Sequence, residues 1–262
     1  MAEIRVAISG AGKMGREVAR ALRDDPELVA CGFIDPLAGT SEIDGLPVRA
    51  EAVEGLDAFG PGVVVDFSNA AFTPGLVEAA IVRGIRPVVG TTGLHAEWLQ
   101  WLAVECERTR LGAVVASNFA IGAVLMMEFA RQASKHFDAA EIIELHHDQK
   151  VDAPSGTAKS TAEGMLAARG RPFEHAGTER ETVPGTRGGE LGGIAIHSVR
   201  LAGFVAHQEV IFGAPGQTLT LRHDTTGRES FMPGVLLAVK AVGGLEGLVV
   251  GLEGLLGLRA GR

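Results

Sequence analysis

The sequence predicts an α/β protein with a parallel-sheet domain followed by a smaller α+β domain. Residues 1–117 alternate short β-branched runs with longer stretches of helical spacing, which is the pattern of consecutive βα units. The continuous apolar run Val63-Val64-Val65 indicates a strand that is covered on both faces. From Asn118 onward, a helix-rich stretch precedes three strand-like runs, as in a sheet with helices on one face. We therefore expect a first domain over 1–117 joined by 227–262, and a second domain over 118–226.

The periodicity of apolar residues places the individual elements. Strands of the first domain are predicted over 4–9, 28–34, 63–67, 87–90 and 113–116, and helices over 14–23, 75–83 and 96–108. The second domain is predicted to contain a helix over 122–137, a strand over 140–145, a helix beginning within 154–157, and strands over 194–201, 208–212 and 218–222.

The C-terminal region 234–258 is apolar, but Lys240, Glu246 and Glu253 interrupt it. A membrane-spanning helix needs about 20 apolar residues, so no membrane partner is expected. The apolar side chains of its second half recur at helical spacing, at Leu245, Leu248, Val249, Leu252, Leu255 and Leu256. They predict an amphipathic helix that docks on the first domain.

Composition and charge exclude several classes of function. Lys and Arg total 24 against 32 Asp and Glu, and no run of basic residues is present, so a nucleic-acid partner is not expected. Cys31 and Cys106 lie far apart without metal-ligand spacing, which argues against a disulfide framework and a structural zinc site. The N-terminal residues show no basic stretch followed by an apolar run, so no secretory signal is expected. We expect a cytoplasmic protein.

A glycine-rich turn follows the first predicted strand, with the sequence Gly10-Ala11-Gly12-Lys13-Met14-Gly15. Glycines at these positions permit a tight turn, the approach of a pyrophosphate to the backbone, and close packing of the helix on the strand. The helix N-terminus attracts the negative charge. Asp35 ends the second strand, where a carboxylate can accept hydrogen bonds from ribose hydroxyls. Together they predict a Rossmann-type dinucleotide-binding domain, although a glycine-rich turn with an unrelated acid is the alternative.

The residues beside Asp35 bear on the choice of coenzyme. Pro36 offers no cation for a 2′-phosphate, and the Asp35 carboxylate would repel one. Lys13 lies near the phosphate-binding turn and could partly neutralise that phosphate. We therefore expect use of both NADH and NADPH, with NADH favoured.

Three further loops end predicted parallel strands, and carboxyl ends of such strands form the ligand-binding edge of an open sheet. Because of this position we expect them to flank the nicotinamide, although a flexible turn or a helix cap would explain the same residues. The candidate contacts are Phe67, Gly90, Thr91, Thr92, Ala116, Ser117, Asn118 and Phe119.

The second polar motif runs from Glu144-Leu145-His146-His147 to Pro154-Ser155-Gly156-Thr157, with Lys150 between them. Adjacent histidines on a strand point to opposite faces, so His146 and His147 are expected to have different tasks. Histidine exchanges protons near neutral pH, and the free amides at the start of a helix bind carboxylates. The motif therefore predicts an acidic small substrate.

Two other interpretations of this motif stay open. Its acidic and histidine side chains could form a metal cluster, but they lack helical ligand spacing, so no metal is expected. The loop could also be only a solvated turn before a capped helix. For the whole chain, the alternatives are another NAD(P)-dependent oxidoreductase acting on an acidic amino acid or semialdehyde, and a nicotinamide-sensing regulator.

At these motifs the sequence resembles the 4-hydroxy-tetrahydrodipicolinate reductase family, the dihydrodipicolinate reductases of the diaminopimelate and lysine pathway. The resemblance covers almost the full chain. It includes the two motifs that flank Lys150, Gly90-Thr91-Thr92-Gly93, Ser117-Asn118-Phe119, Arg187-Gly188-Gly189-Glu190 and residues 207–213. One departure is the glycine turn, which is one residue shorter here than is common in the family.

The resemblance implies specific roles for these residues. His146 is the catalytic proton donor and acceptor and Lys150 a proton donor, while His147, Ser155, Gly156 and Thr157 belong to the site for the cyclic dicarboxylate substrate. It also implies hydride transfer from a reduced nicotinamide to the substrate ring, followed by protonation of the neighbouring carbon. Family members are usually homotetramers joined through sheets of the second domain, with hinge closure during the reaction.

Overall fold

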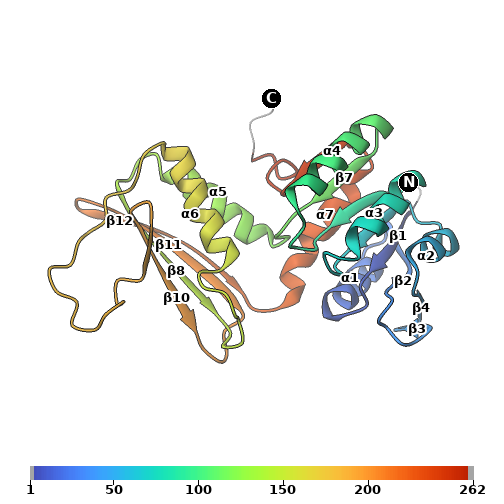
Figure 1. Cartoon of the computed structure of the whole chain (residues 1–262), viewed down its shortest axis with the longest axis horizontal. Helices are drawn as coiled ribbons and strands as arrows, with labels where there is room; N and C mark the ends of the chain where they lie inside the picture. Colours follow the sequence, from blue (N-terminus) through green and yellow to red (C-terminus); the bar gives the residue numbers. More distant parts are fainter. Residues whose placement is uncertain (1–2, 259–262) are drawn as a thin grey trace. The chain divides into compact units, whose positions relative to one another are not determined.

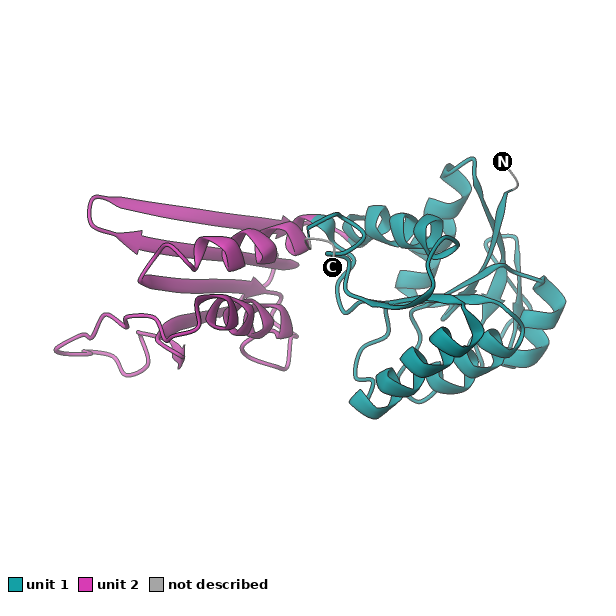
Figure 2. Cartoon of the chain, turned by 90° about the horizontal axis from the view of Figure 1, so that it is seen from above, with its two compact units in different colours: residues 1–121, 228–262 teal, residues 122–227 magenta. Residues whose placement is uncertain are grey.

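The computed structural model describes residues 3–258 and divides the chain into two compact units (Figures 1 and 2). Unit 1 comprises Met1–Ile121 and Arg228–Arg262, and unit 2 comprises Gly122–Gly227. The C-terminal segment thus belongs to the same unit as the N-terminal half of the chain. No helix within the described range is long and apolar enough to cross a membrane.

Unit 1 is built on an eight-stranded sheet with the order β13-β7-β6-β5-β1-β2-β4-β3. Its strands are β1 (Ile4–Ser9), β2 (Leu28–Ile34), β3 (Glu42–Ile43), β4 (Leu46–Arg49), β5 (Val63–Asp66), β6 (Arg86–Val89), β7 (Gly112–Val115) and β13 (Gly247–Val250). All neighbours pair in parallel except β3 and β4, which form an antiparallel hairpin. The strand order reverses beside β1, because β2 and β5 flank it, and this is where such sheets bind ligands.

Helices cover both faces of this sheet. They are α1 (Lys13–Asp24), α2 (Ala52–Phe59), α3 (Thr73–Val82), α4 (Ala96–Thr109) and α7 (Met232–Val242), with a 3₁₀ turn η1 (Arg228–Phe231) before α7. Buried residues of α2 and α3 pack with Ala7 and Val64 of the sheet. Helix α1 lies on the other face, since its Gly15 approaches the side chain of Ile8 and successive strand residues point to opposite sides. Helix α7 contacts α1.

The predicted amphipathic helix over 245–256 is wrong. The chain instead forms β13, which pairs in parallel with β7, and then a series of turns. Gly247, Gly251 and Gly257 have φ angles of +93°, +81° and +69°, which a right-handed helix does not allow. The helix of this region is α7, where Pro233 stands in the first turn. Lys240 of α7 binds Asp25 before β2 at 2.8 Å.

Unit 2 is a five-stranded mixed sheet with two helices. The strands are β8 (Ala139–His146), β9 (Gly189–Leu191), β10 (Ile194–Arg200), β11 (Ala206–Ala214) and β12 (Gln217–Thr225), in the order β12-β11-β8-β10-β9. The helices are α5 (Ile121–Ala133) and α6 (Gly156–Arg169). Strand β8 pairs in parallel with β10 and antiparallel with β11. The predicted fold class, a Rossmann-type domain plus an α+β domain, is confirmed.

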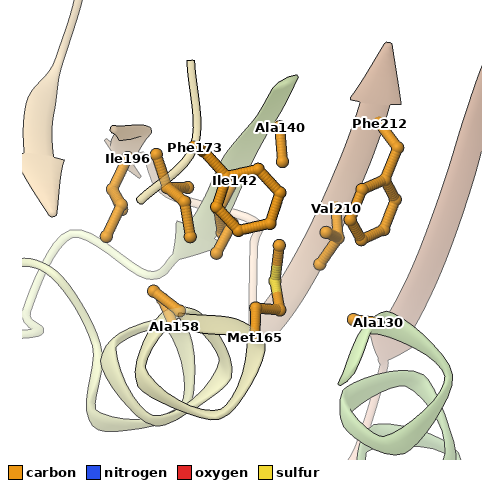
Figure 3. Close-up of a cluster of buried hydrophobic side chains, with 11 residues drawn as sticks. Ala130, Ala140, Ile142, Ala158, Met165, Phe173, Ile196, Val210 and Phe212 are labelled. Carbon is orange, nitrogen blue, oxygen red and sulfur yellow. The ribbon is translucent and has the colours of Figure 1, made fainter. Parts of the chain in front are cut away.

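The core of unit 2 lies between one face of its sheet and the two helices (Figure 3). Ile142 of β8 and Phe212 of β11 pack with Ala130 of α5 and Met165 of α6, and all four are buried. Since side chains alternate along a strand, residues at even positions of β8 share the helix-covered face with Ile142. His146 ends that row and so stands where the core gives way to the loop before α6.

Candidate active site

The glycine turn of unit 1 fits closely against its neighbours. Gly10 has a φ of +89°, and a Cβ atom there would lie 2.6 Å from the carbonyl oxygen of Phe67. A Cβ on Gly12 would meet nothing within 4 Å, so its outer side is open. Lys13 and Met14 begin helix α1, and the Lys13 side chain is exposed. The turn therefore presents an open backbone surface at a helix N-terminus, the arrangement that binds phosphate.

Asp35 ends β2 beside this turn. One of its carboxylate oxygens accepts a 2.7 Å hydrogen bond from the amide of Ala11, and the other accepts one of 2.8 Å from the amide of Leu37. Each carboxylate oxygen has two lone pairs, so both can still accept a hydrogen bond from a hydroxyl. Asp35 thus holds the glycine turn in place, and it lines the same cavity as Gly10 and Gly12.

A cavity of about 200 Å³ lies between these segments. Its lining includes Gly10, Gly12, Asp35, Phe67 and Ser68. An open glycine backbone, a helix N-terminus and a carboxylate therefore surround one hollow at the point where the strand order reverses. This chemistry matches the pyrophosphate and ribose of a dinucleotide.

The loops after β5 and β6 are tied together by a buried carboxylate. Asp66 accepts hydrogen bonds from the hydroxyls of Ser68 at 2.6 Å, Thr73 at 2.6 Å and Thr91 at 2.7 Å. The Thr91 hydroxyl also accepts from the amide of Ser68, so this side chain shapes the loops. Thr92 is exposed beside it.

The Phe67 ring packs directly on the backbone of Gly90, where there is no side chain. A Cβ on Gly90 would lie 2.1 Å from the Phe67 ring, so a side chain there would displace the ring. The ring also meets that of Phe119 edge-on, with centroids 5.6 Å apart.

The loop after β7 carries the remaining candidates for cofactor contacts. Ala116 and Phe119 are buried, whereas the side chain of Ser117 is exposed. The Asn118 side chain accepts a hydrogen bond of 2.9 Å from the amide of Ala120, which fixes the turn into α5. Ser117 and the backbone of this loop are the groups available to a ligand.

In unit 2, His146 binds a buried carboxylate two residues earlier on β8. Its Nδ1 lies 2.5 Å from Oε2 of Glu144, whose side chain is fully buried. Residues two apart on a strand point the same way, so the pair follows directly from the strand geometry. Arg200 of the neighbouring β10 donates to both oxygens of Glu144, at 2.8 Å and 2.7 Å.

Burial and charge oppose each other in this cluster. Burial favours the neutral form of Glu144, but hydrogen bonds from Arg200, Ser198 and His146 outweigh it and lower the pKa of the carboxyl group. Burial also lowers the pKa of His146, although Glu144 acts in the opposite direction, and the charges of Lys150 and Arg200 lower it further. The lowered pKa makes the imidazolium of His146 a stronger acid, whereas the ionised Glu144 carboxylate stabilises the protonated ring.

Lys150 and His147 lie in the loop after β8. The ammonium group of Lys150 donates a 2.6 Å hydrogen bond to Asp152, and its backbone amide donates to the carbonyl of His147 at 3.2 Å. The side chain of His147 is exposed. The loop that leads to α6 therefore carries the positive charge of Lys150, whose ammonium group is fixed by its bond to Asp152.

Helix α6 begins in the same loop. The hydroxyl of its N-cap residue, Ser155, accepts from the amide of Ala158 at 3.2 Å, and the amide of Ser155 donates to Glu144 at 3.1 Å. Gly156 and Thr157 form the first turn, and a Cβ on Gly156 would meet nothing within 4 Å. Amides of a first turn have no partner within their own helix, so this end offers donors to an anion.

Glu144 and Arg200 are the residues of this cluster to which the sequence assigned no role. The alternation of β8 places Glu144 on the face of His146, which is a signal present in the sequence. The partnership with Arg200 depends on the pairing of β8 with β10 and has no such signal. Over residues 3–258, no group of three or more His, Cys, Asp or Glu side chains is arranged to hold a metal ion.

Two family models match the chain over nearly its whole length. The model described as "Dihydrodipicolinate reductase, N-terminus" matches residues 4–119, and that described as "Dihydrodipicolinate reductase, C-terminus" matches residues 122–256. The second model extends past unit 2 into the C-terminal segment of unit 1.

Individual proteins give the same result. The 4-hydroxy-tetrahydrodipicolinate reductase of Moorella thermoacetica is 49% identical over 98% of this chain and 99% of its own, and that of Geobacillus kaustophilus is 48% identical over 97% and 99%. A solved structure, the dipicolinate-bound dihydrodipicolinate reductase from Paenisporosarcina sp. TG-14, has a TM-score of 0.89 and 40% identity, covering 96% of this chain and 99% of its own. The chain therefore belongs to the dihydrodipicolinate reductase family, the NAD(P)H-dependent oxidoreductases that reduce 4-hydroxy-tetrahydrodipicolinate on the route to diaminopimelate and lysine.

Proposed function

We propose that unit 2 binds the cyclic dicarboxylate through the start of α6 and that His146 protonates it during reduction. The observation that carries this proposal is that one loop joins all three groups: His146 ends β8, Lys150 lies in the loop that follows, and the loop leads into the first turn of α6. Gly156 and Thr157 would donate backbone hydrogen bonds to one carboxylate, with Lys150 and His147 as further contacts. Ser155 holds that end of the helix in place.

The chemistry of the substrate explains why an acid is needed. The dehydrated ring carries a conjugated imine, and a bound reduced nicotinamide supplies the hydride. The ring is then an electron-rich enamine whose neighbouring carbon has to take up a proton. His146 is the proposed donor, and Lys150 is proposed to contribute charge and a proton at the same side of the ring.

The coenzyme is proposed to bind unit 1, because the open turn, the carboxylate and the cavity described above suit a dinucleotide. Asp35 and Pro36 favour the unphosphorylated ribose, and the exposed Lys13 tempers that preference, so we propose dual use with NADH favoured. A strong excess of catalytic efficiency with NADPH would contradict this proposal. The proposed contacts are Gly10, Ala11, Gly12, Lys13, Met14, Gly15, Asp35, Phe67, Gly90, Thr91, Thr92, Ala116, Ser117, Asn118 and Phe119.

We also propose a cytoplasmic homotetramer. On the sheet of unit 2, Ile143 and Ile211 lie half-buried on the face opposite α5 and α6, which suits sheet-to-sheet packing between copies. Cys31 and Cys106 are unpaired, which suits a reducing compartment. Analytical ultracentrifugation of the purified chain would measure the oligomer, and a monomeric mass at micromolar concentration would contradict the assembly.

The test of function is oxidation of NADH, and separately of NADPH, when the preceding synthase generates the substrate from pyruvate and aspartate semialdehyde. His146→Gln is expected to lower kcat by about 10²–10⁴-fold with little change in coenzyme affinity, as for loss of a positioned general acid. Lys150→Ala is expected to raise KM and lower kcat. Coenzyme binding without oxidation would redirect the function to another substrate or to a sensor.

Dipicolinate offers a second readout, because the relative from Paenisporosarcina sp. TG-14 is described as dipicolinate-bound. Calorimetric titration with dipicolinate tests the dicarboxylate site without turnover. Lys150→Ala is expected to weaken binding, whereas unchanged affinity would remove Lys150 from the site.

A further inference from the structure

We propose that Glu144 and Arg200 form a buried positioning pair that orients His146, keeps its proton on Nδ1, and holds the start of α6 in place. The inference rests on the proposed function, since it assigns a task to residues that support His146 and the helix amides. Neither residue is proposed to touch the substrate. Both act through the groups that do.

The first step is the charge of Glu144. Its side chain has no exposed surface, and an isolated buried carboxylate would take up a proton. Arg200 prevents this, because its two terminal nitrogens donate in parallel to the two carboxylate oxygens at 2.8 Å and 2.7 Å. Such a bidentate, charge-assisted pair keeps Glu144 ionised.

The second step is the tautomer of His146. An ionised carboxylate can only accept hydrogen bonds, so the contact of 2.5 Å between Oε2 of Glu144 and Nδ1 of His146 requires the proton on Nδ1. The neutral ring therefore has a bare Nε2, and the imidazolium carries its second proton there. Nε2 becomes the nitrogen that exchanges protons with a ligand, in the way that a carboxylate orients a histidine in hydrolases.

The third step is that the Glu144–Arg200 pair also forms hydrogen bonds with the backbone of the loop between β8 and α6. Glu144 also accepts from the amide of Ser155, the N-cap of α6, at 3.1 Å. Arg200 donates to the carbonyl oxygen of Asp152 at 2.7 Å, and the Asp152 side chain binds Lys150. One ion pair therefore touches the segments that carry the proposed acid, the proposed cation and the anion-binding amides.

The pairing of strands explains how these residues meet. In the parallel register of β8 and β10, Glu144 lies opposite Ser198 and His146 lies opposite Arg200. The guanidinium reaches back by two residues to Glu144, where the helix-covered core ends. The charged and titratable groups around His146 are Glu144, Lys150 and Arg200, with Asp152 against the last two.

The unaltered protein supplies the first test. Nitrogen-15 chemical shifts of labelled histidine, assigned by the signal lost in His146→Gln, report which ring nitrogen carries the proton in the neutral form. We expect Nδ1 of His146 to be protonated. A neutral ring protonated on Nε2 overturns the proposal, and this measurement does not depend on any variant of Glu144 folding.

Glu144→Gln is the second test, with Glu128→Gln as its matched control. Glu128 is also a buried carboxylate of unit 2 bound by two nitrogens of one arginine, Arg131, at 2.7 Å each, but this arginine and the further donor Gln132 both belong to α5, the helix that carries Glu128. Glu144→Gln is expected to lower kcat by about 10²-fold, within the range that a positioned general acid contributes. Glu128→Gln is expected to lower thermal stability and to keep kcat.

The pH profile separates positioning from mere structural support. Without the Glu144 charge, the imidazolium of His146 loses its stabilising partner, so the pKa of His146 falls and the protonated fraction near neutral pH decreases. The loss in kcat is therefore expected to stay constant above about pH 6.5 and to shrink as the assay pH is lowered below that value, where His146 of the unaltered protein becomes protonated. Glu144→Asp, which keeps the charge on a shorter side chain, is expected to recover part of the activity.

The outcomes distinguish this inference from the proposed function. If His146→Gln is inactive while Glu144→Gln keeps the kcat and the pH profile of the unaltered protein, the positioning pair is refuted and the proposed acid stands. If His146→Gln keeps full turnover, the proposed acid itself is refuted and the task assigned to the pair falls with it.

Discussion

The start of helix α1 passes so close to the end of β1 that a Cβ atom on Gly15 would lie 1.8 Å from the carbonyl oxygen of Gly10. No real Cβ occupies such a position, and the atom it would meet belongs to the backbone. The glycine turn can therefore keep its shape only if residue 15 has no side chain. Gly12 is the contrast within the same turn, because its outer side is open.

Gly15→Ala is the first prediction. The added methyl must push α1 away from β1, and overpacking of this kind costs about 1–3 kcal/mol. We expect a lower free energy of unfolding in urea and a large loss of NADH affinity measured by fluorescence titration. Gly12→Ala is the control, since its methyl has room: it should keep the stability and weaken only nucleotide binding. Equal stability of both variants would show that the close approach carries no strain.

Asp35→Asn is the second prediction. The amide side chain keeps one accepting oxygen, so either Ala11 or Leu37 loses its partner, and the negative charge beside the ribose disappears. We expect the Kd for NADH to rise by about tenfold, equal to about 1.4 kcal/mol, while the Kd for NADPH changes less. Asp57→Asn, at an exposed carboxylate of unit 1 that binds Arg83, is the control. An unchanged ratio of the two affinities would remove Asp35 from coenzyme selection.

The sequence predicts the elements around β1 well because their apolar runs are long and their turns carry glycine. The strands over 4–9 and 28–34 are found with the predicted bounds. The short pair β3 and β4 and helix α2 were not predicted, since strands of two and four residues leave too little periodicity. The place of β4 depends on its pairing with β2, and that of β3 on its pairing with β4.

The C-terminal region shows the opposite failure. Helical spacing of leucines predicted one amphipathic helix over 245–256, but glycines with positive φ break the chain there, and Gly247–Val250 adds a strand to the edge of the sheet. The spacing of apolar residues carries no information about the backbone φ angles that glycine allows. In the site of unit 2, the motif around His146 consists of residues close together in the sequence, so the sequence predicts it. The ion pair between Glu144 and Arg200 forms only when β8 pairs with β10, so the sequence gives no sign of it.

Ser155→Ala is the third prediction. The Ser155 hydroxyl accepts from the amide of Ala158, and loss of an N-cap costs about 0.5–2 kcal/mol. We expect a lower thermal midpoint and a higher KM for the dicarboxylate, because the start of α6 is less ordered. Ser160→Ala, an exposed position within the same helix, should change neither quantity. A stability loss with an unchanged KM would separate the cap from substrate binding.

The dependence of stability on pH is the fourth prediction. Burial lowers the pKa values of His146 and His223 from the usual 6.5, so between that value and the folded pKa the unfolded chain binds more protons than the folded chain. Stability present above about pH 6.5 is therefore lost as the pH falls. The lowered pKa of Glu144 extends the loss to pH values below about 4.5.

The histidine part of this dependence can be isolated at His223, whose ring lies against Gly122 so closely that a Cβ there would be 2.6 Å from it. Scanning calorimetry of the unaltered protein should show the unfolding temperature falling between about pH 7 and about pH 5.5. His223→Gln cannot take up a proton, so its unfolding temperature should fall less steeply over this interval, even if it starts lower. His175→Gln, at an exposed side chain, should follow the slope of the unaltered protein. An unfolding temperature that rises as the pH falls through this interval would contradict the sign of both histidine shifts.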